Sequence, residues 1–345
     1  MIPESPMAVP HTAGMELWGE RRGDLCAVGV WTEKRLGDGE DAEPLLVHHF
    51  PTGAGILGVF DGVGGAGSAT EYRIGEGPLR TGAWFGSRVA RHAVESWFRR
   101  VVAGWPAELE ALRGWIKTVL ELKRPDIRSK LVGSMRESLP STMAAIHYRR
   151  AGDVLECRAL WAGDSRAYLL DPAAGLLALT RDHCEEADAL KQLRDAPPMV
   201  NSLRAHNPFY LSENSIDVRL PAVLVCVTDG FFGRLDTPAQ LELHMLDRLT
   251  HAQDEHDWAR LLAERVKTYT DDDATLSLVA LGYANFDELR SAFKARTEHL
   301  QDNYHLPASV AEDRKKYRNW CDETWKLYRR DYERHMPRPP EEHVR

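Results

Sequence analysis

The residues best suited to chemistry in this sequence are aspartates that recur at the ends of apolar segments. The clearest case is residues 56–67, where an apolar run of strand type stops at Asp61 and a glycine-rich turn follows. A single aspartate after a strand is commonly a turn residue. Four more apolar segments begin or end in the same way, at Asp24, Asp164, Asp229, and Asp272 or Asp273. Five such positions predict a constellation of carboxylates rather than five separate turns.

A cluster of carboxylates would bind hard divalent cations. Two like charges about 4 Å apart repel by about 4 kcal/mol at an effective dielectric near 20, so positive charge must offset them. Most of these aspartates have no lysine or arginine beside them, and no histidine or cysteine stands at ligand spacing. An all-oxygen site favours Mg²⁺ or Mn²⁺ over zinc or iron. Two such ions bridged by one carboxylate would supply a metal-bound hydroxide and neutralise a phosphoryl group.

The elements that would position these aspartates are short strands around a helical middle. The strands are expected over residues 25–31, 56–60, 142–148, 154–162, 167–170, 222–227 and 276–281. Apolar residues at helical spacing predict helices over residues 83–102, 109–122 and 127–139, another that starts at Thr237-Pro238, and one around residues 258–266. Residues 182–212 contain several breakers and are expected to form a loop-rich lobe, and whether residues 185–212 of it gate access is left open by the sequence.

Composition places the chain among ordinary globular proteins. Its 345 residues are 43% hydrophobic and 28% charged, with a formal net charge of −8, which argues against a general nucleic-acid binder. No stretch is apolar for long enough to span a bilayer, and the N-terminus lacks a signal pattern, so we expect a cytoplasmic protein without a membrane partner. The five scattered cysteines, which form no CxxC pair, are expected to be core residues.

Six motifs in order carry a resemblance to a known family. FDGVGG, STMAA, WAGDSRAYLL, LTRDH, VTDG and DDDATLSLVAL, within about residues 16–283, resemble the metal-dependent type 2C Ser/Thr protein phosphatases in a bacterial style. The resemblance implies an α+β fold, a four-layer αββα sandwich of two antiparallel sheets with helices on both outer sides. It also implies a catalytic domain over residues 1–284 that hydrolyses phosphoserine or phosphothreonine by attack of a metal-bound hydroxide. Its partners would be phosphorylated proteins, a Ser/Thr kinase or the targets of one.

The resemblance assigns roles to individual residues. Asp61 would bridge two Mn²⁺ or Mg²⁺ ions, and the backbone carbonyl of Gly62 would bind one of them. Asp229 and Asp272 would hold the second ion, and Asp164 would belong to a third, weaker metal site. Asp61 and Asp229 would act in catalysis through metal-bound water.

The first strand departs from the family pattern of Arg, two residues, then Asn-Glu-Asp. Arg21-Arg22-Gly23-Asp24 keeps only the final acid, so Asp24 is assigned as a metal ligand and Gly23 replaces the glutamate. Either Arg21 or Arg22 would bind the phosphate dianion, because an arginine fork matches it in bidentate fashion. These departures motivate a second hypothesis, a pseudophosphatase that binds phosphoproteins or acts as a scaffold.

Three further features of the sequence, residues 62–67, Asp164 and residues 285–345, each allow a structural and a functional interpretation. Residues 62–67 match GxGxxG, but a polar loop follows, which disfavours a dinucleotide site. Asp164 could instead cap a hairpin. Residues 285–345 are expected to form a helical extension with one aromatic-rich face, which either packs on the catalytic domain or docks a partner. That face would consist of Tyr317, Trp320, Cys321, Thr324, Leu327, Tyr328 and Tyr332.

Overall fold

Two antiparallel sheets form the centre of the computed structural model, which describes residues 15–67, 70–73, 76–123, 138–195, 197–307, 310 and 313–339. The six-stranded sheet has the order β1 (Met15–Arg22), β2 (Leu25–Thr32), β13 (Ala274–Leu281), β12 (Ala222–Val227), β9 (Arg166–Asp171), β10 (Gly175–Ala178). The five-stranded sheet has the order β11 (Ser212–Arg219), β8 (Val154–Ala162), β7 (Met143–Ala151), β4 (Ala54–Val59), β3 (Leu45–His49). Neighbouring strands in both sheets run antiparallel.

The two sheets pack face to face through apolar side chains. Leu57 and Ile146 of the five-stranded sheet share one buried cluster with Leu169, Leu224 and Val279 of the six-stranded sheet. Strands β4, β12 and β13 are buried along their whole length, because helices cover their outer faces. Their sequences are accordingly apolar without polar alternation.

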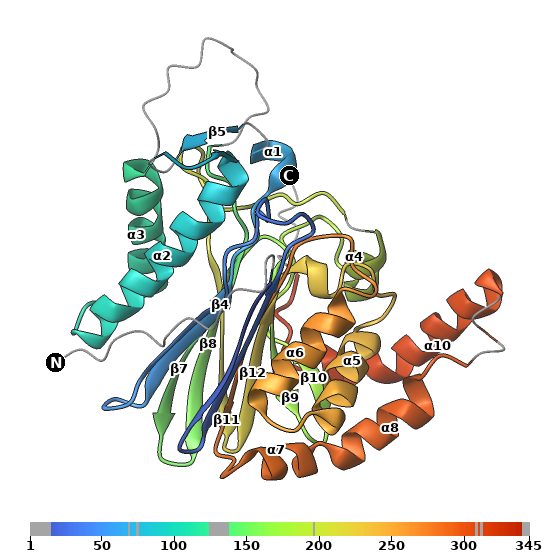
Figure 1. Cartoon of the computed structure of the whole chain (residues 1–345). Coiled ribbons are helices and arrows are strands. Elements are labelled where there is room, and N and C mark those ends of the chain that lie inside the picture. The colour runs from blue at the N-terminus through green and yellow to red at the C-terminus, as the bar shows by residue number, and fades with distance from the viewer. Residues whose placement is uncertain are drawn as a thin grey trace.

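Helices form the two outer layers, as Figure 1 shows. Helices α2 (Gly82–Val102) and α3 (Leu109–Leu122) cover the five-stranded sheet, where Phe98 and Ile116 share a buried cluster with Leu160. The other side carries α5 (Pro238–His251), α6 (Glu255–Val266), α7 (Phe286–Ala292), α8 (Lys294–Tyr304) and α10 (Arg314–Tyr332). Trp258 of α6 packs there with Val225. The predicted four-layer αββα sandwich is therefore confirmed.

Several short elements complete the chain. They are α1 (Gly64–Gly67), the hairpin of β5 (Thr70–Arg73) and β6 (Leu79–Thr81), α4 (Ala189–Asp195) and the 3₁₀ turn η1 (Asp229–Phe231). The sequence analysis did not predict β1, β3, the β5–β6 hairpin, β10 or β11. The helix predicted over 127–139 lies mostly outside the described residues.

The helices after β13 pack on the sandwich. Tyr328 and Tyr332 of α10 are buried in the same cluster as strand β9, and the Tyr332 hydroxyl lies 3.4 Å from that of Tyr168. Leu327, expected on the same face, is instead 74% exposed. The aromatic face is thus a packing face, and the division of the chain at residue 284 stays a prediction. Within the described residues, no helix is long and apolar enough to cross a membrane.

Candidate metal centre

Strand ends from both sheets meet at one end of the sandwich and carry the aspartates there. Asp61 follows β4, Asp164 lies between β8 and β9, and Asp229 follows β12. The strand pairs β4–β7, β7–β8, β9–β12 and β12–β13 place these three ends together. Backbone bonds fix the first position, since the Thr142 amide donates to the Asp61 carbonyl oxygen at 2.8 Å.

A further aspartate, Asp41, reaches this end from the loop between β2 and β3. Its side chain is 1% exposed, and Oδ2 accepts hydrogen bonds from the hydroxyls of Thr228 and Thr275, both at 2.8 Å. Asp41 and Asp61 also share a hydrogen bond between their carboxyl groups. The sequence analysis missed Asp41 because it lies in a polar loop and not beside an apolar run. The Glu40-Asp41 pair is the signal that could have found it.

We call the four carboxyl groups of Asp41, Asp61, Asp164 and Asp229 the acid cluster, and the pKa of each of them is raised. Burial is the main cause, and the neighbouring carboxylates add to it. The pKa rises to about 7 for Asp41, Asp164 and Asp229, and the pKa of Asp61 rises well above its ordinary value. The cluster therefore holds protons near neutral pH unless a cation replaces them.

The donor set of the acid cluster fits a hard divalent cation. Oδ1 of Asp164 is buried and has no hydrogen-bond partner within the described part of the chain. All donors are carboxylate oxygens, the ligands that Mg²⁺ and Mn²⁺ prefer. Among the described residues, no group of three or more histidine, cysteine, aspartate or glutamate side chains has the geometry to coordinate one metal ion directly. Because Mg²⁺ usually keeps several waters, carboxylates spread around a shared space still suit it.

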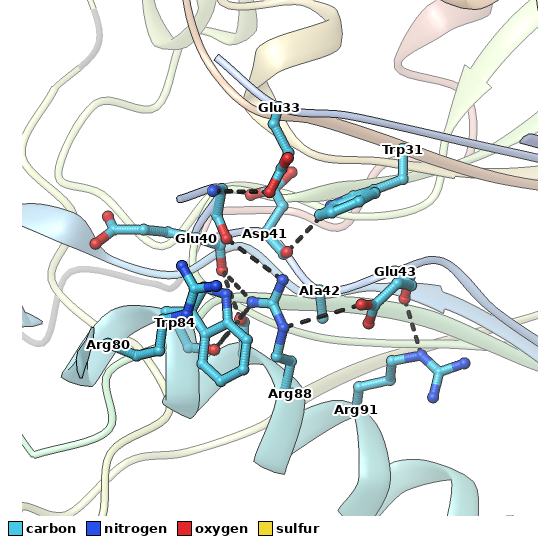
Figure 2. A network of polar contacts seen from close by, with 12 residues as sticks. Trp31, Glu33, Glu40, Asp41, Ala42, Glu43, Arg80, Trp84, Arg88 and Arg91 are labelled. Carbon is cyan, nitrogen blue, oxygen red and sulfur yellow. Dashed lines mark hydrogen bonds and ion pairs between the residues drawn. The ribbon is translucent and has the colours of Figure 1, made fainter. Parts of the chain in front are cut away.

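Helix α2 holds the loop that carries Asp41 (Figure 2). The Ser87 hydroxyl donates to the Glu40 carbonyl oxygen at 2.5 Å, and Nη2 of Arg88 donates to the Gly39 carbonyl oxygen at 3.3 Å. The Arg88 guanidinium also lies over the Trp84 ring, 4.0 Å from its centre. These bonds satisfy backbone carbonyls that a loop alone leaves without partners.

The opposite side of the same loop is held by Asp273. Its carboxylate accepts from the backbone amides of Lys34, at 2.8 Å, and Glu40, at 2.6 Å. Asp272 beside it is exposed, and its charge contributes to the raised pKa of Asp229. Asp272 therefore borders the acid cluster, whereas Asp273 organises the loop.

Gly62 lies under the same loop. A Cβ atom there would stand 2.7 Å from the carbonyl oxygens of both Glu40 and Ala83, so a side chain does not fit. The backbone at Gly62 thus comes close to Glu40, next to the acid cluster. The role of its carbonyl as a metal ligand stays a prediction.

A buried cation stands behind Asp164. Arg166 forms a bidentate ion pair with Asp182, at 2.9 and 2.7 Å, and lies 4.1 Å from the centre of the Phe232 ring. Burial and the carboxylates of Asp229 and Asp182 raise the Asp164 pKa, and the Arg166 charge offsets only part of that rise. His183 accepts a hydrogen bond from the Gly163 amide at 3.2 Å, which holds the turn that carries Asp164.

Asp24 lies at the opposite end of the sandwich, which corrects the sequence-based assignment. It sits in the β1–β2 turn and pairs with Arg150 at 2.6 Å. The β2–β13 register pairs Leu25 with Leu281 at this end and Thr32 with Ala274 at the other. Seven residues of strand separate the two ends by about 23 Å, at about 3.3 Å per residue. The structure therefore does not bring Asp24 to Asp61.

The two arginines predicted to bind phosphate are also remote from the acid cluster. Arg21 pairs with Glu255 at 2.5 Å and donates to the Tyr283 carbonyl oxygen at 2.9 Å. Arg22 stacks 4.6 Å from the centre of the Phe50 ring. Because neighbouring antiparallel strands run in opposite directions, successive turns lie at opposite ends of the sheet. The positions of charged residues in the sequence do not show at which end a given turn lies.

Other cations lie near the acid cluster. A pocket of about 490 Å³ is lined by Lys34, Arg35 and Arg80 and by four carboxylates, those of Asp38, Glu40, Asp272 and Asp273. Arg80 comes from strand β6, pairs with Asp38 at 3.1 Å and donates to the Gly37 carbonyl oxygen. This pocket is where an anion could approach the acid cluster.

The sandwich has the fold of the metal-dependent Ser/Thr phosphatases, which confirms the resemblance at the level of fold. The serine/threonine phosphatase PstP of Mycobacterium tuberculosis matches with a TM-score of 0.50 and 15% identity, over 74% of this chain and 98% of that chain. PppA, a regulatory component of T6SS in Pseudomonas aeruginosa, has a TM-score of 0.47 and 21% identity, over 75% and 98% of the two chains. RsbX in complex with magnesium has a TM-score of 0.47 and 13% identity, over 77% and 100%. No protein-family model and no curated protein sequence matches the chain.

Proposed function

We propose that this protein is a metal-dependent phosphatase that hydrolyses phosphoserine or phosphothreonine on proteins. One observation carries the proposal: four carboxylates from strand ends and one loop gather at a single end of the sandwich, where burial and nearby carboxylates raise the pKa of each. Such an arrangement is unstable without compensating positive charge. Divalent cations offset it most directly.

The residues of the acid cluster have distinct roles in this proposal. Asp61 and Asp41 share a hydrogen bond and would hold the pair of Mn²⁺ or Mg²⁺ ions together with Asp229, with Asp272 at the edge. The Gly62 carbonyl would add one backbone ligand, and Asp164, with its unpartnered Oδ1, would serve a third, weaker site. When bound, the ions supply a nucleophile by lowering the pKa of water and neutralise phosphoryl charge.

The phosphate group would enter through the pocket beside the acid cluster. Lys34, Arg35 and Arg80 line this pocket with four carboxylates, so these cations would orient the dianion while the bound metal ions offset the carboxylate charge. Arg21 and Arg22 play no part in this proposal, because they lie near the other end of the sheet. Substrates would be phosphorylated proteins, including a Ser/Thr kinase or its targets, and the protein would act in the cytoplasm.

The direct test is hydrolysis of p-nitrophenyl phosphate with Mn²⁺ present and then chelated. We expect metal-dependent turnover that Asp61→Asn abolishes, while the circular dichroism spectrum of the variant stays that of the native protein. Turnover that persists in EDTA, or in Asp61→Asn, contradicts the proposal.

The pseudophosphatase hypothesis shares the same fold. It was motivated by Gly23 and by the position of Arg21 and Arg22, all of which now lie outside the acid cluster. What still favours it is that no three potential ligands of the described residues already surround one point. Absence of any metal-dependent signal in the same assay, with intact phosphoprotein binding, would favour this scaffold role.

A further inference from the structure

A second pocket, of about 670 Å³, lies among the helices that cover the six-stranded sheet. Its walls come from the turn after η1, from α5 and α6, and from α8 and α10, which lie at the right of Figure 1. The volume suits a small organic molecule. Among the described residues, no carboxylate of the acid cluster lines it.

Cationic side chains outnumber anionic ones in this pocket. Its described lining contains three arginines against two aspartates, and the two histidines of the lining are not counted as charged. Both aspartates already have partners, since Asp236 accepts the Tyr317 hydroxyl and Asp247 pairs with Arg248. Such a concentration of cations in a chain with a net charge of −8 makes a local site for an anion.

Arg265 is the cation best placed to receive an anion. Its Nη2 donates to Nε2 of His244 at 2.6 Å, and its Nη1 donates to the Thr268 hydroxyl at 3.5 Å. Its guanidinium also lies 6.0 Å from the centre of the Tyr269 ring. Within the described ranges of the chain, no carboxylate lies at ion-pair distance from it. Its planar fork matches phosphate or carboxylate oxygens.

Two buried donors at the pocket lack acceptors. Because a guanidinium can only donate, Nε2 of His244 must accept, and the neutral ring then carries its proton on Nδ1. Burial, reinforced by Arg265, lowers the His244 pKa to about 3, so the ring stays neutral. Within the described chain, Nδ1 of His244 and Nε of Arg248 have no hydrogen-bond partner. Buried donors without acceptors are destabilising. Both atoms are closed off from solvent, so the ligand would bind through the accessible part of the Arg265 side chain and not through them.

We propose that this pocket binds a small organic anion, with a phosphate or carboxylate group on Arg265 and Arg248 and an apolar body against Leu235 and Leu243. The site is independent of the acid cluster and of catalysis. The pocket is nevertheless close to the acid cluster along the chain. Its wall residue Arg234 directly follows the turn that begins at Asp229, in which the Gly233 amide donates to the Asp229 carbonyl oxygen at 2.5 Å. Arg234 also pairs at 2.5 Å with Asp271, next to Asp272, so a bound anion would stand beside a link to the acid cluster.

The test uses full-length protein and phenylphosphonate, whose carbon–phosphorus bond a phosphatase does not hydrolyse. Calorimetric titrations are run with EDTA, where the acid cluster repels anions, and again with Mg²⁺. Benzoate in parallel titrations distinguishes a carboxylate from a phosphonate preference. We expect saturable binding that Arg265→Gln weakens at least tenfold.

Two further variants make the outcome decisive. Arg260→Gln, on the same helix but exposed and paired with Asp257 and Glu264, should bind as the native protein does. Gln301→Glu adds a negative charge at an exposed pocket residue and should weaken binding with the same melting temperature as the native protein. No saturable binding of either probe, or an affinity in Arg265→Gln and Gln301→Glu as high as that of the native protein, overturns the proposal. Neither result bears on phosphatase turnover.

Discussion

At the scale of single residues, the chain's own polar and positively charged groups compensate only part of the negative charge of the acid cluster. Asp41 is stabilised by the hydroxyls of Thr228 and Thr275, and Arg166 supplies one buried positive charge behind Asp164. These contacts do not return the carboxyl groups to their ordinary pKa values, since the pKa values of Asp41, Asp164 and Asp229 remain raised to about 7. The remaining compensation must come from protons or from bound cations.

The first prediction compares Asp41→Asn with Asp24→Asn. Asp41→Asn removes a buried carboxylate of the acid cluster and should lower Mn²⁺ affinity and metal-dependent turnover by about 100-fold. Asp24→Asn breaks only an exposed ion pair with Arg150, which contributes about 0–1 kcal/mol, and should leave both quantities unchanged. Calorimetric Mn²⁺ titration of the two variants measures this, and equal losses would refute the assignment of Asp41.

The second prediction concerns pH in metal-free protein. The pKa of Asp229 is about 7 in the folded chain and about 3.9 when unfolded, so between these values the folded chain binds more protons. The free energy of unfolding therefore falls as pH rises through this window. Buried His147 and His183, whose pKa values are lowered to about 4, act in the opposite sense up to about pH 6.5.

The measurement is therefore a difference between two proteins. We expect the melting temperature of the native protein in EDTA to fall relative to that of Asp229→Asn between pH 5 and pH 8, because the variant lacks one of the groups that ionise. Adding Mn²⁺ at pH 8 should reverse the fall in the native protein. A constant difference between the two proteins across this range would contradict the raised pKa.

Three members of the acid cluster could be predicted from the sequence because they end apolar strands. Asp61, Asp164 and Asp229 follow that rule, and the structure brings them together. Asp24 follows the same rule but lies at the opposite end, because successive antiparallel strands reverse direction. Asp41 follows no rule of strand ends, since its position depends on how a loop folds back onto α2.

At the scale of elements, helix α2 does more than cover a sheet. Its first turns hold the carbonyl oxygens of Gly39 and Glu40 through Arg88 and Ser87 (Figure 2). The helix begins at the Thr81 cap, whose hydroxyl accepts from the Trp84 amide at 3.0 Å and also donates to the Glu40 carboxylate at 2.6 Å. The sequence predicted this helix from its apolar face but gave no sign of its polar contacts with the loop.

The third prediction tests α2 as the support of the Asp41 loop. Arg88→Gln removes contacts to the loop carbonyls and the stacking on Trp84, and should weaken Mn²⁺ binding about tenfold through misplacement of Asp41. Arg99→Gln, on the exposed end of the same helix and paired only within it to Glu95, is the matched control. Equal Mn²⁺ affinities in the two variants would show that the loop holds its shape without Arg88.

At the scale of the whole molecule, the helices after β13 complete the six-stranded side. Arg296 of α8 pairs with the fully buried Glu242 of α5 at 2.6 and 2.9 Å, and the Tyr328 hydroxyl of α10 donates to the same carboxylate. Sequence periodicity predicted an amphipathic helix here but left its partner open. The partner is the chain's own sandwich, because the aromatic face shares the core cluster of β9 and β12.

The fourth prediction separates packing from docking on α10. Trp325→Ala removes a buried ring and should lower the free energy of unfolding by about 3–5 kcal/mol. Leu327→Ala, two residues further on and exposed, should change it by less than about 0.5 kcal/mol. Urea unfolding of the two variants measures this. A small effect of Trp325→Ala would mean that the helix is only loosely attached to the sandwich.

The most direct test of the central claim is anomalous diffraction from crystals of the full-length protein soaked in Mn²⁺. We predict manganese peaks within coordination distance, about 2.0–2.3 Å, of carboxylate oxygens of Asp41, Asp61 and Asp229, and none at Asp24. A soaked crystal with no manganese among these three residues, or with manganese bound at the Asp24 end, would contradict the account.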